Sequence, residues 1–329
     1  MIAKLVRRHA IVLAVAAGFA LPAAPARAEE FQTWLAALRA EALDRGIAAT
    51  TLDQALDGVK PIKRVIELDR RQPEFTLTFG QYRQRVVPRS RIEKGRRLLR
   101  QNRDLLAKIG RRHGVQPRFI VALWGIETDF GRVTGGFPVI ASLATLAHDG
   151  RRSAYFRKEL LNALRILDEG HITAKAMVGS WAGAMGQCQF MPSSFIAHAV
   201  DHDGDGRRDI WTSRGDVFAS AANYLGKSGW RADQTWGREV RLPAGFDRAL
   251  SGIKVRKPIG EWQALGVRRA DGGDLPSRQL RASIVLPEKG KMTPAYMVYR
   301  NYRTTLYWNR STYFALAVGL LSDGIGGGG

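Results

Sequence analysis

One carboxylate, Glu127, lies in an otherwise apolar stretch, ALWGIETDFG, that runs from Ala122 to Gly131. A carboxyl group among Trp and Leu side chains stays protonated near neutral pH, because burial disfavours its charged form. A protonated acid is what the cleavage of a glycosidic bond requires at the leaving oxygen. Glu127 is therefore a candidate catalytic residue, and the alternative is a structural acid paired with one of the many arginines.

The sequence around Glu127 predicts the helix that would position it. Pro117 suits the first turn of a helix. Asp129 is rotated by about 200° from Glu127 about the helix axis, so the two acids are not expected to work as a pair. The residues that follow the spacing of one helical face are Ile120, Leu123, Trp124 and Glu127.

A second motif, GSWAGAMGQCQFMPSS, runs from Gly179 to Ser194 and mixes small residues with amides and aromatic rings. Polar edges suit sugar hydroxyls and rings suit the apolar face of a sugar. The alternative is a tightly packed corner between a helix and a loop. Cys188 in this motif is the only cysteine, which rules out an intramolecular disulfide, and we expect it to be a small core residue rather than a nucleophile.

An acidic run begins at Asp201 and resembles the start of an EF-hand loop, with the required glycine at position 6. Position 12 is Thr212 rather than Glu, so the standard loop is not completed. Many carboxylates favour calcium over magnesium. Two other interpretations stay open: Arg207 and Arg208 neutralise the cluster, and Asp216 caps the next helix.

The N-terminus has the pattern of a secretory signal peptide over residues 1–28. Basic residues precede the apolar run Ile11–Leu21, and Ala26–Ala28 forms a small-residue cleavage motif. The apolar run is too short to span a bilayer, and no cysteine near the cleavage motif could carry a lipid. The sequence thus predicts export to the periplasm, with no transmembrane segment in the mature chain.

The chain is strongly basic, with a formal net charge of +21. Removal of residues 1–28, which hold four basic and no acidic residues, lowers this charge to +17. The excess favours a polyanionic neighbour, either wall peptide carboxylates or anionic lipid headgroups. Nucleic acid is not expected, because no recognition motif accompanies the charge. The alternative is that the arginines merely keep the protein soluble.

Hydrophobic patterning predicts helices over most of the chain. A capping box at Ser90–Glu93 predicts the start of a long basic helix that Gly114 ends. Further helices are expected from Ser153, over 216–229 and over 311–321. Between residues 236 and 294, frequent Pro and Gly and two alternating runs indicate short strands. These runs are 239–242 and 282–286.

Six motifs occur in the order and spacing of the B-type lytic murein transglycosylases, which the sequence resembles over nearly all of the mature chain. Several separate motifs in one order are a specific signal. They are WGIETDFG at 124–131, GRR at 150–152, SWAGAMGQCQFMPSS at 180–194, DHDGDGRRDIW from Asp201, ASAANYL at 219–225 and WNRS at 308–311.

The resemblance implies a mainly α fold, in which a lysozyme-like catalytic core carries an additional helical region and a small β-containing segment. The implied parts are the signal peptide (1–28), the N-terminal helical region (29–115), the catalytic core with the EF-hand-like loop (116–235), the β-containing or irregular segment (236–294), the return to the core (295–325) and a disordered tail (326–329).

The resemblance also implies a peptidoglycan lytic transglycosylase. Such an enzyme cleaves the β-1,4 bond between N-acetylmuramic acid and N-acetylglucosamine without consuming water, and leaves a 1,6-anhydromuramoyl end. Glu127 would first protonate the glycosidic oxygen and then take the proton of the muramoyl C6 hydroxyl. One carboxylate suffices because the substrate supplies the nucleophile, whereas ordinary glycosidases use two carboxylates.

Further site residues follow from the resemblance. The arginine pair of GRR suits muramoyl or peptide carboxylates. Trp308 stands where the family has tyrosine, which removes a phenol hydroxyl. Asp216 would complete a longer metal loop, one residue later than in the family. The implied substrate-binding residues are Arg151, Arg152, Ser180, Gln189, Tyr224 and Asn309, and the implied ligands of a structural calcium ion are Asp201, Asp203, Asp205, Arg207 and Asp216.

The expected partners are peptidoglycan glycan strands, with cell-wall synthases as candidate protein partners and no organic cofactor. Two other functions remain open at this point. The same fold could hydrolyse the bond as a muramidase, or the protein could be a non-catalytic cell-wall-binding scaffold.

Overall fold

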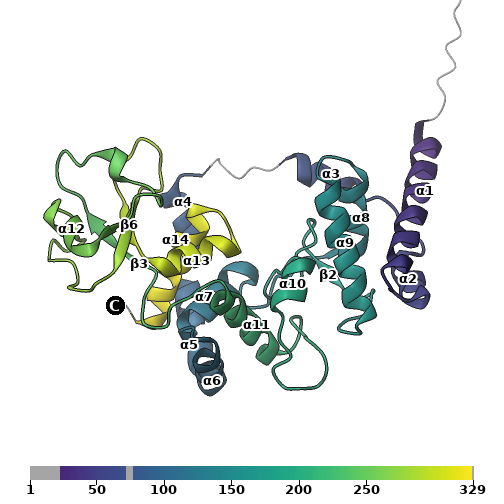
Figure 1. Ribbon diagram of the computed structural model, residues 1–329, viewed down its shortest axis with the longest axis horizontal. Coiled ribbons are helices and arrows are strands. Elements are labelled where there is room, and N and C mark those ends of the chain that lie inside the picture. Colours follow the sequence, from purple (N-terminus) through teal and green to yellow (C-terminus); the bar gives the residue numbers. More distant parts are fainter. Residues whose placement is uncertain (1–22, 72–76, 328–329) are drawn as a thin grey trace, which may run out of the picture.

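The computed structural model describes residues 23–71 and 77–327. These residues are mainly helical, as predicted, and they form three groups of elements along the molecule (Figure 1). The predicted signal peptide lies outside the described residues except for 23–28, which begin the first helix. No helix in the described ranges is long and apolar enough to cross a membrane.

The middle group surrounds the helix that carries Glu127. This helix, α7, packs against α5, α6, α11 and α14. Gly95 of α5 and Gly125 of α7 make room for this packing, because a Cβ on Gly125 would lie 2.7 Å from the Phe130 ring. The helices of the group are α4 (Phe79–Val86), α5 (Arg89–Gln101), α6 (Arg103–His113), α7 (Pro117–Thr128), α11 (Arg214–Lys227), α13 (Arg300–Trp308) and α14 (Thr312–Gly326).

The second group is a helical bundle at the other side of the molecule from the sheet (Figure 1). Its centre is the pair α8 and α9, against which α2 and α10 pack, and α3 packs on α8. A two-stranded ribbon of β1 and β2 joins it to the middle group. Its elements are α1 (Ala23–Asp44), α2 (Ala49–Leu56), α3 (Lys63–Arg70), α8 (Val139–His148), α9 (Ser153–Asp168), α10 (Pro192–His198), β1 (Phe137–Pro138) and β2 (Val178–Gly179).

The third group is a five-stranded antiparallel sheet in the order β4-β6-β7-β3-β5. It has its own apolar core, in which Trp262, Ile284 and Met297 are fully buried. Both strands that the alternating runs predict are present, as β3 and β6. The elements are β3 (Gly237–Arg241), a 3₁₀ turn (Arg248–Leu250), β4 (Lys257–Pro258), α12 (Ile259–Ala264), β5 (Arg268–Arg269), β6 (Arg281–Val285) and β7 (Ala295–Val298).

Two predictions about helix ends are wrong. The helix expected from a capping box at Ser90 begins at Arg89, directly after Pro88, and has no side-chain cap. It is also two helices, because the backbone leaves the helical conformation at Asn102, with φ −111° and ψ 22°. The Asn102 side chain donates to the Leu98 carbonyl at this break. The capping box that the structure does contain joins Thr78 and Gln81 at the start of α4.

The expected disordered tail is also wrong for the part of it that the structure describes. Gly326 is the last residue of α14, and Gly327 is its left-handed cap with φ 93°. Residues 328–329 lie outside the described residues. Helix α14 begins after Ser311, whose side chain accepts a hydrogen bond from the Phe314 N–H, so this predicted helix is present and longer than expected.

Candidate active site

Glu127 lies in the last turn of α7, at the point where the chain turns sharply. Asp129, Phe130 and Gly131 follow with φ of 50°, 61° and 80°, three consecutive left-handed residues that end the helix. The Asp129 carboxylate pairs with Arg132 at 2.6 Å and with Lys94 at 3.4 Å. Asp129 thus lies beyond the helix rather than on it, and basic side chains engage its carboxylate.

The carboxyl group of Glu127 has a single donor and an apolar environment. Its Oε1 atom accepts a hydrogen bond of 2.7 Å from Nε1 of Trp308, at the end of α13. Burial raises the pKa of Glu127 to about 7, and the Trp308 bond offsets part of that rise. Among the residues that the structure describes, the polar partner of the Glu127 carboxyl group is the Trp308 indole and not an arginine, which differs from the interpretation of Glu127 as an acid paired with an arginine.

With a pKa near 7, the protonated and the ionised forms of Glu127 are both present at neutral pH. The indole N–H of Trp308 can only donate, so it bonds to an oxygen that accepts. The transferable proton of the acid form is therefore on Oε2.

The Trp308 contact leads to a prediction about pH dependence. The bond stabilises the charged form of Glu127, so Trp308→Phe should raise the pKa of Glu127 by about one unit. The alkaline limb of the profile of turnover against pH, where the acid form is lost, should move to higher pH by the same amount. Trp308→Tyr keeps a donor and is the control, which should leave the limb within about 0.3 units of the wild type. An unmoved limb in Trp308→Phe would contradict the assigned contact.

Aromatic side chains from three elements surround this contact. The Trp308 ring lies 4.8 Å from that of Tyr224 on α11 and 5.2 Å from that of Phe190, between centroids. The Tyr224 hydroxyl donates to the Tyr307 carbonyl at 2.8 Å. Tyr82 of α4 is also near Glu127. Burial raises the pKa of Tyr82, and the negative charge of Glu127 raises it further. The sequence predicted Tyr224 and included Phe190 among the aromatic residues of the 179–194 motif, but it missed Tyr82.

The loop at 179–190 lies against α7 through Gln187, one of the amides of the motif, which was not among the predicted substrate-binding residues. Gln187 accepts from Trp124 Nε1 at 2.8 Å and donates to the Trp211 carbonyl at 2.7 Å. Ser180 and Gln189 instead fix the loop itself: the Ser180 hydroxyl accepts from the Ala184 N–H, and the Gln189 amide donates to the Thr134 carbonyl. These bonds to the backbone therefore fix the positions of the Ser180 and Gln189 side chains within the loop.

Cys188 in the same loop is buried, as expected of a core residue. Its thiol donates to the Val217 carbonyl at 3.3 Å, and burial raises its pKa. A thiol with a raised pKa is a poor nucleophile.

The predicted arginine pair lies at the turn between α8 and α9 and is held by a residue that the sequence analysis missed. Arg151 donates to the Asp69 carboxylate of α3 at 2.6 and 2.7 Å, and Arg152 binds the same carboxylate. Asp69 is 2% exposed, and the bond to Arg151 is the largest cause of its lowered pKa. The arginine side chains remain 49% and 41% exposed, which leaves guanidinium N–H groups for another anion.

Asn309 follows Trp308 directly and lies in the turn between α13 and α14. Its side-chain oxygen accepts from the Ser311 N–H at 2.9 Å. The exposed Asn309 amide therefore lies directly after the residue that contacts Glu127 and three residues before the start of α14 at Thr312.

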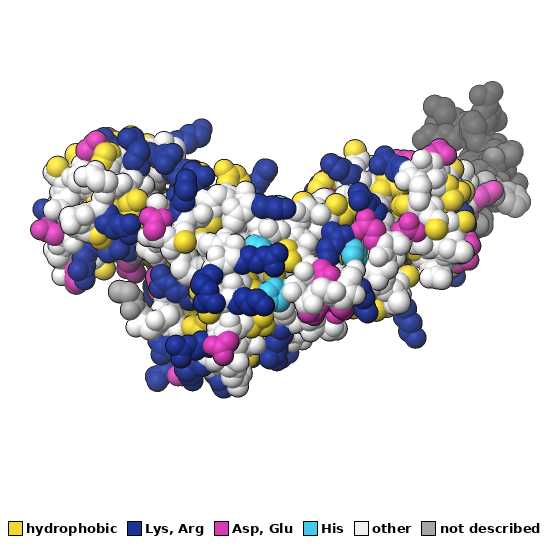
Figure 2. Space-filling view, turned by 60° about the horizontal axis from the view of Figure 1, so that its bottom comes forward, with side chains coloured by type: hydrophobic (Ala, Val, Ile, Leu, Met, Phe, Trp, Pro, Cys, Tyr) yellow, Lys and Arg dark blue, Asp and Glu magenta, His cyan; other side chains and the backbone are white. Residues whose placement is uncertain are grey.

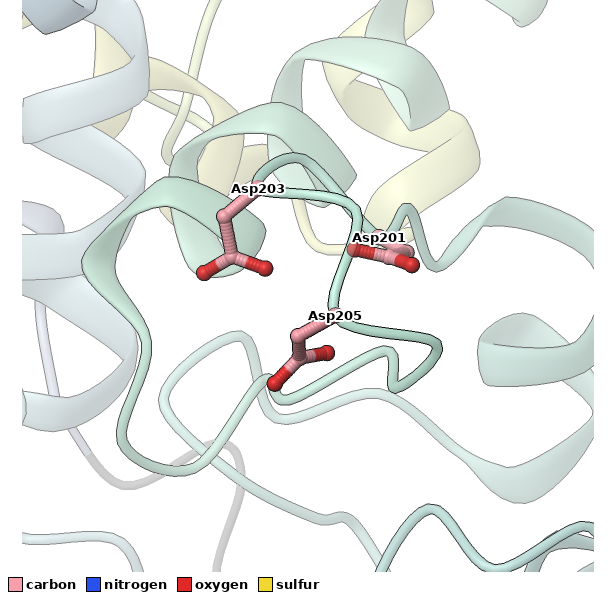
Figure 3. A group of neighbouring side chains, drawn as sticks. All are labelled: Asp201, Asp203 and Asp205. Atoms are coloured by element: carbon pink, nitrogen blue, oxygen red, sulfur yellow. The ribbon is translucent and has the colours of Figure 1, made fainter.

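The acidic loop between α10 and α11 brings three carboxylates together. Oxygens of Asp201, Asp203 and Asp205 lie within 4.8 Å of one another (Figure 3). Asp201 also accepts the N–H groups of Gly204 and Gly206, and the Arg207 N–H donates to Asp205. The loop thus presents oxygens of the kind that calcium prefers.

The other residues considered for this loop have different partners. Asp216 is fully buried, accepts the N–H groups of His202 and Asp209 at 2.8 and 2.6 Å, and is not part of the cluster. Burial raises its pKa to about 6. Ser213, not Asp216, caps α11, so that alternative is wrong. Arg208 does not neutralise the cluster either, because it bonds to His171 and Glu169.

A half-buried acid at the end of a helix, inside a mainly helical core and next to aromatic rings, is the arrangement expected of a lysozyme-like glycan-cleaving enzyme. The chain belongs to the family of the Transglycosylase SLT domain, whose model matches residues 30–323. The resemblance found in the sequence is thereby confirmed. The protein is a lytic transglycosylase that acts on peptidoglycan.

Individual relatives agree with this assignment. Membrane-bound lytic murein transglycosylase B of Escherichia coli (strain K12) is 31% identical over 302 residues, which are 85% of this chain and 79% of that protein. SltB3 from Pseudomonas aeruginosa, in complex with NAG-anhNAM-pentapeptide, has a TM-score of 0.88 at 48% identity and covers 91% of this chain and 80% of its own. Slt35 of Escherichia coli, in complex with calcium, has a TM-score of 0.75 at 28% identity, with 89% and 92% covered.

Proposed function

We propose that the enzyme cleaves the β-1,4 bond between N-acetylmuramic acid and N-acetylglucosamine without water, with Glu127 as its sole acid and base. The observation that carries this proposal is the isolated Glu127 carboxyl group with its pKa near 7. Asp129, the nearest acid in sequence, forms ion pairs with Lys94 and Arg132 instead. The anhydro sugar bound by the relative SltB3 supports the same reaction.

The reaction balances with one carboxyl group. Glu127 gives its proton to the glycosidic oxygen as the bond from that oxygen to muramoyl C1 breaks. The muramoyl C6 hydroxyl oxygen then forms a bond to C1, and its proton returns to Glu127. Water is not consumed, so no second carboxylate is needed to activate it.

A reducing-sugar assay on purified glycan strands tests this proposal. We expect strand length to fall while the number of reducing ends stays constant. A 1,6-anhydro end has no free hemiacetal, so it does not count as a reducing end in the assay. A muramidase would create one new reducing end for each cleavage, which would contradict the proposal.

We infer that substrate contacts come from Arg151, Arg152, Ser180, Gln189, Tyr224 and Asn309. Tyr224 supports this inference most directly, because its ring packs on Trp308 beside Glu127. The exposed parts of Arg151 and Arg152 suit peptide carboxylates. Lys and Arg side chains are also spread over the face in Figure 2, which favours an anionic wall polymer as substrate.

We also infer that the acidic loop binds calcium as a structural ion through Asp201, Asp203 and Asp205. Three neighbouring carboxylates repel one another without a cation, so the ion would stabilise the loop. The calcium complex of the relative Slt35 supports this inference. Arg207, at position 7, would contribute its backbone carbonyl. Asp216 would hold the two ends of the loop through its backbone contacts.

A thermal melt tests the calcium site. At 100 times its Kd, calcium adds about 2.7 kcal/mol to the free energy of unfolding, so the melting temperature should rise by several degrees. Asp203→Asn should remove most of that rise, whereas Asp57→Asn, an exposed acid at the end of α2, should keep it. An equal rise in all three proteins would contradict the site.

We further propose export to the periplasm through the N-terminal segment, with glycan strands as the substrate there. Cell-wall synthases remain candidate partners.

A further inference from the structure

We propose that a cavity between the sheet and the turn from α13 to α14 binds a carboxylate of the peptide stem on the glycan strand. The cavity has a volume of about 280 Å³. Its charged lining residues are Arg248 and Arg310, and its hydroxyl residues are Ser251 and Thr312. The inference rests on the proposed function, because it concerns a subsite for the same substrate.

The positive charge in this cavity has no acidic partner among the described residues. Arg310 is exposed and forms no hydrogen bond or ion pair there. Arg248 donates to the carbonyls of Lys291 and Glu288, at 3.1 and 3.3 Å, and these neutral groups leave its charge uncompensated. An anion that enters the cavity would therefore meet two guanidinium groups that have no acid of their own.

A third guanidinium group lies behind the cavity wall. Arg303 of α13 donates to the Ser283 hydroxyl at 2.7 Å and to the carbonyl of Ile253, which lines the cavity. Burial, and then the charge of Arg256, lower its pKa. The nearby acid Glu288 is already bound to Lys291 and to the Phe79 N–H. The environment thus favours a negative charge that the chain itself does not provide.

The start of α14 adds to this preference. Thr312, the first residue of this 15-residue helix, lines the cavity, and the Ser311 side chain caps the Phe314 N–H rather than the N–H of Thr312. Helix N-termini bind anions through such groups. Two arginines and one helix start therefore converge on the same space.

The cavity and the Glu127 contact share the turn after α13. Arg310, which lines the cavity, is two residues from Trp308, a span of at most about 7 Å of chain, and Trp308 bonds to Glu127. The peptide stem is carried by the muramoyl sugar, whose bond is cleaved. Apolar residues of the lining, Val285 and Leu306, would contact the uncharged part of the stem. Arg151 and Arg152 share the Asp69 carboxylate, whereas Arg248 and Arg310 have no acidic partner among the described residues, so the cavity offers a second place for a stem carboxylate.

Steady-state kinetics on two substrates test the inference. The first substrate is glycan strands with pentapeptide stems, and the second is the same strands after an amidase has removed the stems. Arg310→Gln should raise KM about tenfold on the first substrate, with kcat unchanged, and change KM less than twofold on the second. Arg310→Lys should restore part of the affinity. Arg100→Ala, which removes an exposed charge on α5, should match the wild type on both substrates.

The outcomes separate this inference from the proposed function. A wild-type enzyme that produces reducing ends would contradict the proposed function, whatever its stem preference. Arg310→Gln could change KM equally on both substrates, or change it on neither. Either result would contradict the proposal that the cavity binds the peptide stem. Arg248→Ala should repeat the result of Arg310→Gln. Arg248 also donates to two carbonyls, so Arg248→Ala could fail to fold for structural reasons. In that case the result for Arg310→Gln is the one that decides the test.

Discussion

Glu127→Gln should lower kcat on glycan strands by about 10³- to 10⁴-fold. The amide keeps the shape of the side chain and can still accept the Trp308 bond through its oxygen. It can neither give a proton to the glycosidic oxygen nor take one from the C6 hydroxyl. The release of soluble muropeptides from sacculi measures this loss.

Asp129→Asn is the matched control for this substitution. Asp129 lies two residues away and is the left-handed cap of α7, a conformation that Asn tolerates. Its loss should weaken the pairs with Lys94 and Arg132 and leave kcat within about threefold of the wild type. Full activity of Glu127→Gln, or an equal loss in Asp129→Asn, would overturn the assignment of Glu127 as the only catalytic acid.

Gly131→Ala should lower the free energy of unfolding by about 2–4 kcal/mol. Gly131 has φ 80°, and a Cβ there would lie 2.3 Å from the Gln187 side-chain oxygen. Gln187 has little freedom to move, because its amide is bonded to Trp124 and to the Trp211 carbonyl. Denaturant unfolding measures the loss of stability.

The control for Gly131→Ala lies five residues away. At Gly136 an added Cβ has nothing within 4 Å, and φ is outside the left-handed region. Gly136→Ala should therefore stay within about 0.5 kcal/mol of the wild type. Equal stability of the two variants would show that the Gln187 contact does not fix the turn after Glu127.

Local sequence features predicted the part of the site that α7 carries. The apolar run, Pro117 and the helical spacing are all contained within twelve residues, and α7 spans them as Pro117–Thr128. In the left-handed turn after Glu127, only Gly131 is a residue type that suits the conformation. Asp and Phe rarely adopt positive φ, so the sequence did not predict that Asp129 and Phe130 would do so.

Contacts between distant segments could not be predicted in this way. Trp308 and Glu127 are 181 residues apart, and the sequence marked Trp308 only as a departure from the family's tyrosine. Asp69, which binds both arginines of the pair, lies about 80 residues before them with no motif of its own. The family resemblance indicated the arginines, but only the fold shows what holds them.

Competition between local signals explains the wrong helix ends. Ser90 and Glu93 have the spacing of a capping box, which would make Arg91 the first helical residue, but α5 starts two residues earlier, at Arg89, directly after Pro88. Thr78 and Gln81 have the same spacing and do form the box, before α4. Spacing alone does not distinguish the two sites, because both have a polar residue three positions after a hydroxyl.

The most direct test of the central claim is the mass of the muropeptides released from sacculi in water enriched in ¹⁸O. A single carboxyl group that returns its proton through the C6 hydroxyl predicts 1,6-anhydromuramoyl ends without ¹⁸O. Reducing muramoyl ends that carry ¹⁸O at C1 would show that water attacks the bond, and would contradict Glu127 as acid and base of a non-hydrolytic cleavage.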